Sequence, residues 1–272
     1  MKKTKQKENN IITKQEAFIK EHKKYHFRIF SWRIIIFALF ITLWEGAVAL
    51  NWIDPFFFSS PSRVVLSFWE LLTTDNLLMH IGITLFETLV SFFLVVVIGL
   101  CMATLLWYSQ TVSEISEPYL VVLNSLPKSA LAPLFIVWLG TGTTTIIVAG
   151  ISVALFGSII SLYTGFKQVD KEKVTLIQTL GGSKKDAFKL VVLPSSIPTI
   201  LSTMKVNIGL ALVGVIIGEF LAARRGLGYL IIYGTQVFQM HMVITSIILL
   251  CIIAMGLYTC IQKEEHYYKK RM

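Results

Sequence analysis

Long uncharged apolar runs alternate with short polar segments along these 272 residues. Six runs come close to the roughly 20 residues that a helix needs to cross the hydrocarbon core of a bilayer. They are Trp32–Leu50, Ile81–Tyr108, Tyr119–Leu139, Thr143–Tyr163, Ile197–Leu221 and Met242–Ile261. The pattern predicts an all-α integral membrane protein with about six transmembrane helices, and the glycines at 140 and 142 predict a tight turn between the third and fourth.

One polar segment, Gly165–Pro194, separates the fourth and fifth runs and carries six lysines. Within it, Lys173–Leu180 is predicted to be a short helix, and Gly181 with Gly182 to form a flexible break. Ser183 is expected to open a second short helix. We call residues 165–194 the coupling segment.

The second helix of the coupling segment has a local start signal and a local stop signal. Ser183 and Asp186 have the Ser-x-x-acid spacing in which each side chain can accept a hydrogen bond from the other residue's backbone. Phe188 lies on the apolar face of this helix. Pro194 lacks the backbone donor of a helix interior and is expected to end it.

Charge predicts the orientation, because basic residues in short loops tend to stay cytoplasmic. Of the 25 Lys and Arg residues, ten lie in Met1–Arg33, six in the coupling segment and four in Gln262–Met272. Six crossings would place all three on one side. We therefore expect cytoplasmic tails at 1–31 and 262–272, a transmembrane domain at 32–261 and a multi-pass location in the bacterial plasma membrane. Lysines beside an anionic leaflet account for the net charge of +9 without nucleic acid.

Four residues within the runs are candidates for a transport pathway. Ionisable groups are costly in hydrocarbon, so Glu45 and Glu87 need an explanation, either as pathway groups or as hydrogen-bond partners of a neighbouring helix. Pro127 and Pro133 free backbone carbonyls near membrane depth, which is tolerated where protein or a water-filled cavity covers them. The third run is thus a candidate pathway lining, and a simple proline kink is the alternative.

The stretch Asn124–Gly142 and the coupling segment together resemble the membrane subunits of bacterial ABC importers of the nitrate, sulfonate, taurine and thiamine-precursor type. That family has Glu-Ala-Ala, then Gly four residues later, then an apolar-x-Leu-Pro ending. Gly181 and Leu193-Pro194 fit this spacing, whereas Thr175-Leu176-Ile177 replace Glu-Ala-Ala. Further matches in order along the chain are Trp44-Glu45, Phe58–Ser62, Gly218-Glu219 and Gly226–Ile231.

The resemblance implies a type I ABC importer-like fold with cytoplasmic coupling helices that contact an ATPase dimer. The residues predicted to serve ATPase coupling are Gly181 at the bend, Ser183 and Asp186 at the cap, Phe188 for the apolar contact, and Leu193 with Pro194 at the exit into the membrane. The resemblance further implies a second copy of the permease and an extracellular binding protein that delivers nitrate, a sulfonate or a thiamine-precursor pyrimidine. The sequence lacks a phosphate-binding Gly-x-x-x-x-Gly-Lys-Ser/Thr loop. No cofactor is therefore expected on this chain, and ATP with Mg²⁺ is expected on the partner.

Two other classes of protein are alternatives. A membrane enzyme would need a nucleophile with its base or a cluster of metal ligands, and the five histidines all lie outside the runs. A carrier driven by an ion gradient would favour repeated halves or broken helices, and no clear repeat is visible. The sequence therefore favours a transport subunit without catalytic or metal-binding residues of its own.

Overall fold

The computed structural model describes the backbone of residues 2–74 and 76–271, and the side chains of residues 19, 21–74, 76–268 and 270. The regular elements in these ranges are helices. They are α1 Lys2–Ala49, α2 Pro55–Phe58, α3 Pro61–Thr73, α4 Leu77–Tyr108, α5 Gln110–Ser125, α6 Lys128–Leu139, α7 Thr143–Lys167, α8 Lys171–Thr179, α9 Lys184–Ala187, the π-helix η1 Phe188–Val192, α10 Leu193–Ala222, α11 Leu227–Gln236 and α12 Met240–Arg271. The chain divides into two units, Met1–Val65 and Leu66–Met272.

The first unit contains α1, which carries the first apolar run. Large side chains such as Phe37 and Leu43 expose 67% and 62% of their surface, as expected of a helix that faces lipid. Glu45 accepts hydrogen bonds from the backbone nitrogen of Ser62 at 3.0 Å and from its hydroxyl at 2.8 Å. The carboxylate thus satisfies the first turn of α3, which supports the hydrogen-bonding explanation of Glu45.

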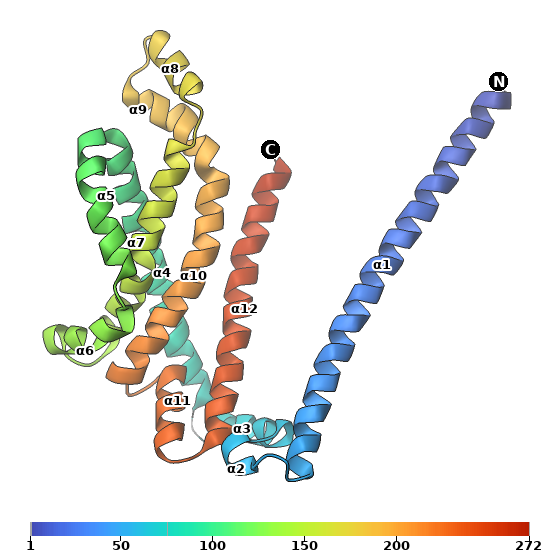
Figure 1. Ribbon diagram of the computed structural model, residues 1–272, viewed down its shortest axis with the longest axis vertical. Coiled ribbons are helices and arrows are strands. Elements are labelled where there is room, and N and C mark those ends of the chain that lie inside the picture. The colour runs from blue at the N-terminus through green and yellow to red at the C-terminus, as the bar shows by residue number, and fades with distance from the viewer. Residues whose placement is uncertain (1, 75, 272) are drawn as a thin grey trace. The chain divides into compact units, whose positions relative to one another are not determined.

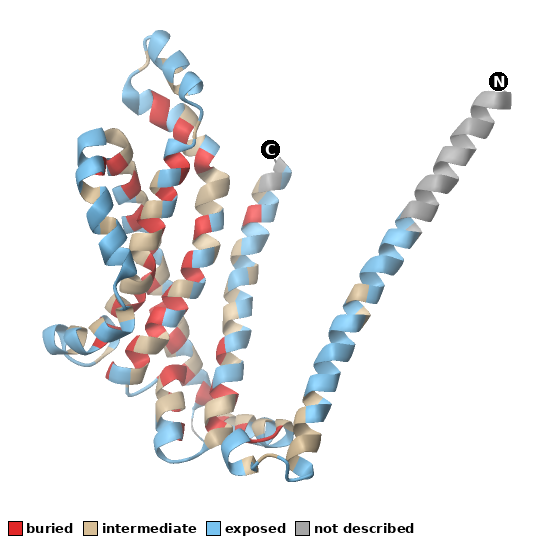
Figure 2. Cartoon of the chain, in the orientation of Figure 1, coloured by how far each residue is buried: buried red, intermediate tan, exposed pale blue. Residues whose placement is uncertain are grey.

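The second unit is a bundle in which α4, α7 and α10 pack together and α12 packs against α10 (Figure 1). Buried residues concentrate where α4, α7 and α10 face one another (Figure 2). The coupling segment lies at the end of this bundle where α7 ends and α10 begins, opposite the turn between α10 and α11. The same long helices therefore connect the coupling segment at one end of the second unit with the α10–α11 turn at the other.

Small residues allow α7 and α10 to approach closely. A methyl group at Gly214 of α10 would lie 2.8 Å from both the carbonyl oxygen of Ala149 and the Cα of Gly150 in α7. One at Gly218 would lie 2.9 Å from the Cα of Ile146. In a bilayer, where burial of apolar surface gives little drive for helices to associate, such backbone contact is a main source of attraction.

The third predicted span, Tyr119–Leu139, is wrong as a single helix. Its residues form the end of α5 and all of α6, which meet at an angle of 94°. Leu126 is extended because the ring of Pro127 disfavours helical geometry in the preceding residue. The Nζ of Lys128 donates to the carbonyl oxygens of Leu123 and Leu126 at 2.5 and 2.9 Å, which satisfies acceptors that the bend leaves free.

The other predicted crossings correspond to long helices. Within the described ranges, five helices are long and apolar enough to cross a membrane, or six if the bent α5–α6 pair counts as one crossing. The predicted turn is confirmed, with Gly140 and Gly142 at φ +78° and +133° between α6 and α7. Helix α1 continues through the expected boundary at residue 31, so the division into tail and span there stays a prediction.

The contact between α7 and α10 can be tested with two glycines of one helix. Gly214→Ala should lower the free energy of unfolding by about 1–3 kcal/mol, because the new methyl group forces the two backbones apart. Gly209→Ala is the matched control, since a methyl group there has no heavy atom within 4 Å. Unfolding of the purified protein in mixed micelles by increasing SDS measures both, and equal stability of the two variants would contradict the close contact.

Candidate functional site

The first half of the coupling segment is α8, and its ends are defined by local hydrogen bonds. Asp170 caps the start through the backbone nitrogen of Glu172 at 2.9 Å. At the other end of α8, Gly181 has φ +89°. The backbone nitrogen of Gly181 donates to the carbonyl oxygen of Gln178, and that of Gly182 donates to the carbonyl oxygen of Ile177. This pair of bonds is a Schellman motif, so the predicted glycine break is a defined turn that reverses the chain.

The second half of the coupling segment begins with the predicted capping box. The Asp186 nitrogen donates to the Ser183 hydroxyl at 3.2 Å, and the Ser183 nitrogen donates to the Asp186 carboxylate at 2.9 Å. The prediction that Pro194 ends this helix is wrong. The π-helix η1 widens the ladder, with the Leu193 nitrogen bonded to the Phe188 carbonyl, and α10 continues through Pro194 in its first turn.

Phe188, which is predicted to supply the apolar contact of the coupling segment, is buried within the chain, and its part in ATPase coupling stays a prediction. Its side chain is only 9% exposed, and its ring lies 5.1 Å from Trp107, 5.5 Å from Tyr108 and 5.6 Å from Phe166. Nearby, Lys184 donates to the carbonyl of Tyr108 at 2.7 Å. The aromatic cluster therefore fixes the coupling segment to the ends of α4 and α7.

The outward side of the coupling segment presents apolar side chains to solvent. Leu176 on α8 is 57% exposed, and Leu180 at its end is 76% exposed. Leu176 is the middle residue of the Thr-Leu-Ile sequence that stands where the resemblance leads one to expect Glu-Ala-Ala. Leu176 thus stands in the place of the first alanine of that pattern, and Thr175 stands in the place of its glutamate.

At the opposite end of the second unit, Glu219 of α10 is the centre of a buried polar cluster with His80 and Thr84 of α4. Oε1 of Glu219 accepts from the Thr84 hydroxyl at 2.6 Å, and Oε2 accepts from the backbone nitrogen of Gly228 at 2.5 Å. Thr84 in turn accepts from the backbone nitrogen of Leu227 at 2.9 Å. The carboxylate lies at the start of α11, where unpaired backbone donors favour negative charge.

This cluster explains why the chain has glycines at 226 and 228. Gly226 has φ +114°, and its nitrogen donates to Nδ1 of His80 at 3.0 Å. A methyl group at Gly226 would overlap the carboxylate of Glu219, and one at Gly228 would lie 2.7 Å from Oε2. Only glycine allows the backbone to approach the buried carboxylate this closely.

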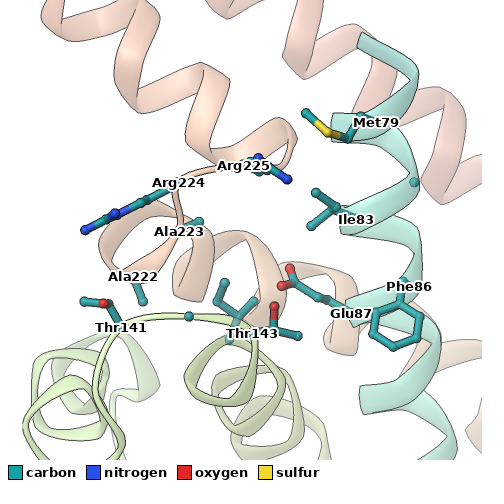
Figure 3. A pocket seen from close by; sticks show the side chains of 13 residues that line it. Met79, Ile83, Phe86, Glu87, Thr141, Thr143, Ala222, Ala223, Arg224 and Arg225 are labelled. Atoms are coloured by element: carbon teal, nitrogen blue, oxygen red, sulfur yellow. The ribbon is translucent and has the colours of Figure 1, made fainter. Parts of the chain in front are cut away.

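A cavity of about 700 Å³ lies beside the polar cluster. Its wall comes from one side of α4, the turn before α7, the first turn of α7, and the end of α10 with the residues that follow it. The lining residues are Met79, Gly82, Ile83, Phe86, Glu87, Thr141, Gly142, Thr143, Ile146, Ala222, Ala223, Arg224 and Arg225. Glu87 is 1% exposed, and Figure 3 shows its carboxyl group pointing from α4 toward Thr143. Arg224 and Arg225 are exposed at the rim.

Four of the predicted coupling residues, Gly181, Ser183, Asp186 and Phe188, lie in the hairpin, and Leu193 with Pro194 opens α10. The predicted pathway residues have separate local settings. Glu87 lines the cavity, Glu45 bonds within the first unit, Pro127 is at the bend and Pro133 lies inside α6. Sequence reasoning missed the partners of Glu219, although the matching Gly218-Glu219 and Gly226-Leu-Gly motifs were signals. It also missed the ion pair between Lys205 of α10 and Glu265 of α12.

The second unit is thus a bundle of helices long and apolar enough to cross a membrane, with a capped hairpin at one end and a cavity at the other, which is the architecture of an integral membrane protein. The family model described as "Binding-protein-dependent transport system inner membrane component" matches residues 95–264, and the chain belongs to this family. It is the permease subunit of an ABC importer, a multi-pass membrane protein and not an enzyme, and ATP hydrolysis resides in a separate subunit.

Three relatives match between 72% and 86% of the chain. A probable ABC transporter permease protein of Haemophilus influenzae is 28% identical over 236 residues, covering 86% of this chain and 95% of that protein. The taurine transport system permease protein TauC of Escherichia coli is 27% identical and covers 86% of this chain and 90% of its own. The formylaminopyrimidine transport permease protein ThiX of Halalkalibacterium halodurans is 26% identical, and the match covers 72% of this chain and 77% of that protein.

Solved structures show the same fold. A chain of the MetNI methionine ABC transporter in an inward-facing conformation has a TM-score of 0.62 at 18% identity, covering 71% of this chain and 96% of that one. A chain of an amino acid ABC transporter has a TM-score of 0.58 at 17% identity, and the match covers 75% of this chain and 98% of that one. The type I importer-like fold expected from the resemblance is thereby confirmed.

The anchoring role of Phe188 predicts a large loss of stability on truncation. Phe188→Ala should lower the free energy of unfolding by about 3–5 kcal/mol, because it leaves a cavity between three aromatic rings. Leu190→Ala, at a 64% exposed position of η1, should change it by no more than about 0.5 kcal/mol. SDS unfolding of the two variants measures the difference, and similar small losses would show that Phe188 is not an anchor.

Proposed function

We propose that this permease imports a small solute as a dimer of two copies, driven by two cytoplasmic ATPase subunits that bind ATP and Mg²⁺. The coupling segment contacts a groove on the ATPase, and an extracellular binding protein delivers the solute. Nucleotide-driven movement of the ATPase pair then tilts α7 and α10 and alternately exposes the pathway to the two sides of the membrane. Both termini lie in the cytoplasm, as the concentration of basic residues near the coupling segment and the chain ends favours.

The observation that supports this mechanism best is the construction of the coupling segment. Its exposed leucines lie on a hairpin with a Schellman turn and a capping box, and both ends of the hairpin lead into long bundle helices. Phe188 fills the inner side of the hairpin with aromatic contacts. A contact surface fixed in this way can pass a displacement to α7 and α10 without deforming first.

The pathway and the solute class belong to the same proposal. The bend at Pro127, the interior Pro133 of α6 and the cavity beside Glu87 are the pathway elements that this chain contributes. Relatives are named for taurine, aliphatic sulfonates and formylaminopyrimidine, so the solute is a small polar molecule of the sulfonate, nitrate or pyrimidine class.

Leu180 provides the test of coupling. In a complex purified with the co-expressed ATPase, Leu180→Ser should reduce ATPase retention or hydrolysis about tenfold, because it removes a 76% exposed apolar contact from the hairpin. Leu66→Ser is the matched control, since this leucine of α3 is 70% exposed and distant from the coupling segment. ATP hydrolysis by the two reconstituted complexes is the measurement.

Two outcomes would contradict the proposed function. One is full solute uptake by this chain in proteoliposomes without any ATPase. The other is an unchanged rate of hydrolysis and unchanged copurification for Leu180→Ser, which would remove the coupling segment from the interface. Equal damage from Leu66→Ser would likewise attribute the effect to folding and not to contact.

A further inference from the structure

Two adjoining cavities lie where α5, the end of α7 and the coupling segment meet, at one end of the second unit (Figure 1). The larger has a volume of about 540 Å³ and opens beside α8. The smaller has a volume of about 230 Å³ and lies between α5 and α7. The residues that line both are Leu106, Ser113, Glu117, Tyr163 and Lys167. The two cavities therefore form one continuous space, which we call the α5–α7 groove.

The wide end of the α5–α7 groove carries exposed side chains of both charges. Lys167 of α7 and Lys171 of α8 line it, and so do Glu114 and Glu117 of α5. Glu114 accepts a hydrogen bond from Gln110 at 2.8 Å. None of the four charged groups forms an ion pair with another described residue. Unpaired groups of both signs around one cavity match a ligand that itself carries both signs.

Aromatic side chains place this wide end at the level of the lipid headgroups. Trp107 and Tyr108 are the last residues of α4, and Trp and Tyr concentrate at the membrane–water interface. The ammonium group of Lys184 lies 5.4 Å from the ring centroid of Trp107 and donates to the Tyr108 carbonyl. That of Lys167 lies 5.1 Å from the ring centroid of Tyr163. These contacts hold two cations where lipid phosphates lie.

The narrow end of the groove is apolar and follows the membrane-crossing helices. Leu120 and Val121 of α5 and Ile160 of α7 contribute to its wall. Along α7, Ile160 lies about 10 Å before Lys167, and along α5, Leu120 lies about 9 Å beyond Glu114. Both directions lead away from the coupling segment. The groove thus extends from the interface toward the hydrocarbon region, as a lipid does.

We propose that the α5–α7 groove binds a phospholipid whose headgroup carries a primary amine. The phosphate contacts Lys167 and Lys171, the ammonium group contacts Glu114 and Glu117, and the start of an acyl chain lies along the apolar end. A purely anionic headgroup would be repelled by the two glutamates, and a choline headgroup has no N–H to donate to them. A soluble phosphate ester would leave the apolar end without a partner. The bound lipid would join α5 to the coupling segment.

Native mass spectrometry of the full-length permease, released from detergent micelles, tests this proposal with lipids of identical acyl chains. Phosphatidylethanolamine is compared with phosphatidylcholine, which has three methyl groups on the same nitrogen, and with phosphatidylglycerol, which lacks the nitrogen. Phosphatidylethanolamine should bind about tenfold more tightly than either. Glu117→Gln should reduce the preference over phosphatidylcholine to about twofold or less, whereas Lys167→Gln should weaken the binding of all three lipids.

Matched controls separate recognition from general effects of charge. Lys185→Gln and Glu172→Gln remove exposed charges of the coupling segment that lie outside the groove, and both should leave lipid binding unchanged. Ile160→Trp fills the apolar end and should weaken binding of phosphatidylethanolamine about tenfold without any change of charge. Glycerophosphoethanolamine, the same headgroup without acyl chains, should fail to displace the lipid at about a hundredfold molar excess.

Four results would overturn the inference. Equal affinity for phosphatidylethanolamine and phosphatidylcholine, tighter binding of phosphatidylglycerol, or an unchanged preference in Glu117→Gln would each remove the amine contact. Effective competition by glycerophosphoethanolamine would show that the groove takes a soluble phosphate ester and not a lipid. Because the permease is tested without an ATPase and without a transported solute, each of these results leaves the importer mechanism standing.

Discussion

The close contact between α7 and α10 is the constraint on which the rest of the second unit depends. Gly214 and Gly218 of α10 bring its backbone into direct contact with that of α7, so the two helices behave as one stiff element. The coupling segment connects the end of α7 to the start of α10, and the cavity lies near their opposite ends. A displacement applied to the hairpin therefore reaches the far side of the bundle through packed helices and not through flexible loops.

Glu87 and Glu219, the two carboxyl groups buried near the cavity, differ in their hydrogen-bond partners and not in their burial. Glu219 is fully hydrogen-bonded to a hydroxyl and a backbone nitrogen, and these bonds hold the turn before α11 against α4. Glu87 shares these surroundings and interacts with Thr143 and Glu219, but its Oε2 has no hydrogen-bond partner among the described residues. Position within an apolar run does not distinguish them, whereas the partners of each oxygen do.

Features with a local cause were predictable from sequence, and features made by distant contacts were not. The Gly181 break and the Ser183–Asp186 capping box follow from turn and cap chemistry within a few residues. The burial of Phe188 depends on aromatic residues of α4 and α7, and the main side-chain partner of Glu219 lies 135 residues away in the chain. Pro127 correctly predicted an irregularity in the third apolar run. The angle of the bend, 94°, depends instead on how α5 and α6 pack.

The π-turn of η1 has a consequence for how such permeases can diversify. Each residue of a helix advances the chain by about 100° around the axis, so one extra residue in a wide turn rotates everything before it relative to everything after it. The hairpin precedes η1 and the membrane-crossing part of α10 follows it. Loss or gain of a single residue at this turn would thus rotate the hairpin about the axis of α10 and leave both flanking helices unchanged. Such a change is a simple route by which one arrangement of membrane helices can fit ATPases that are oriented differently.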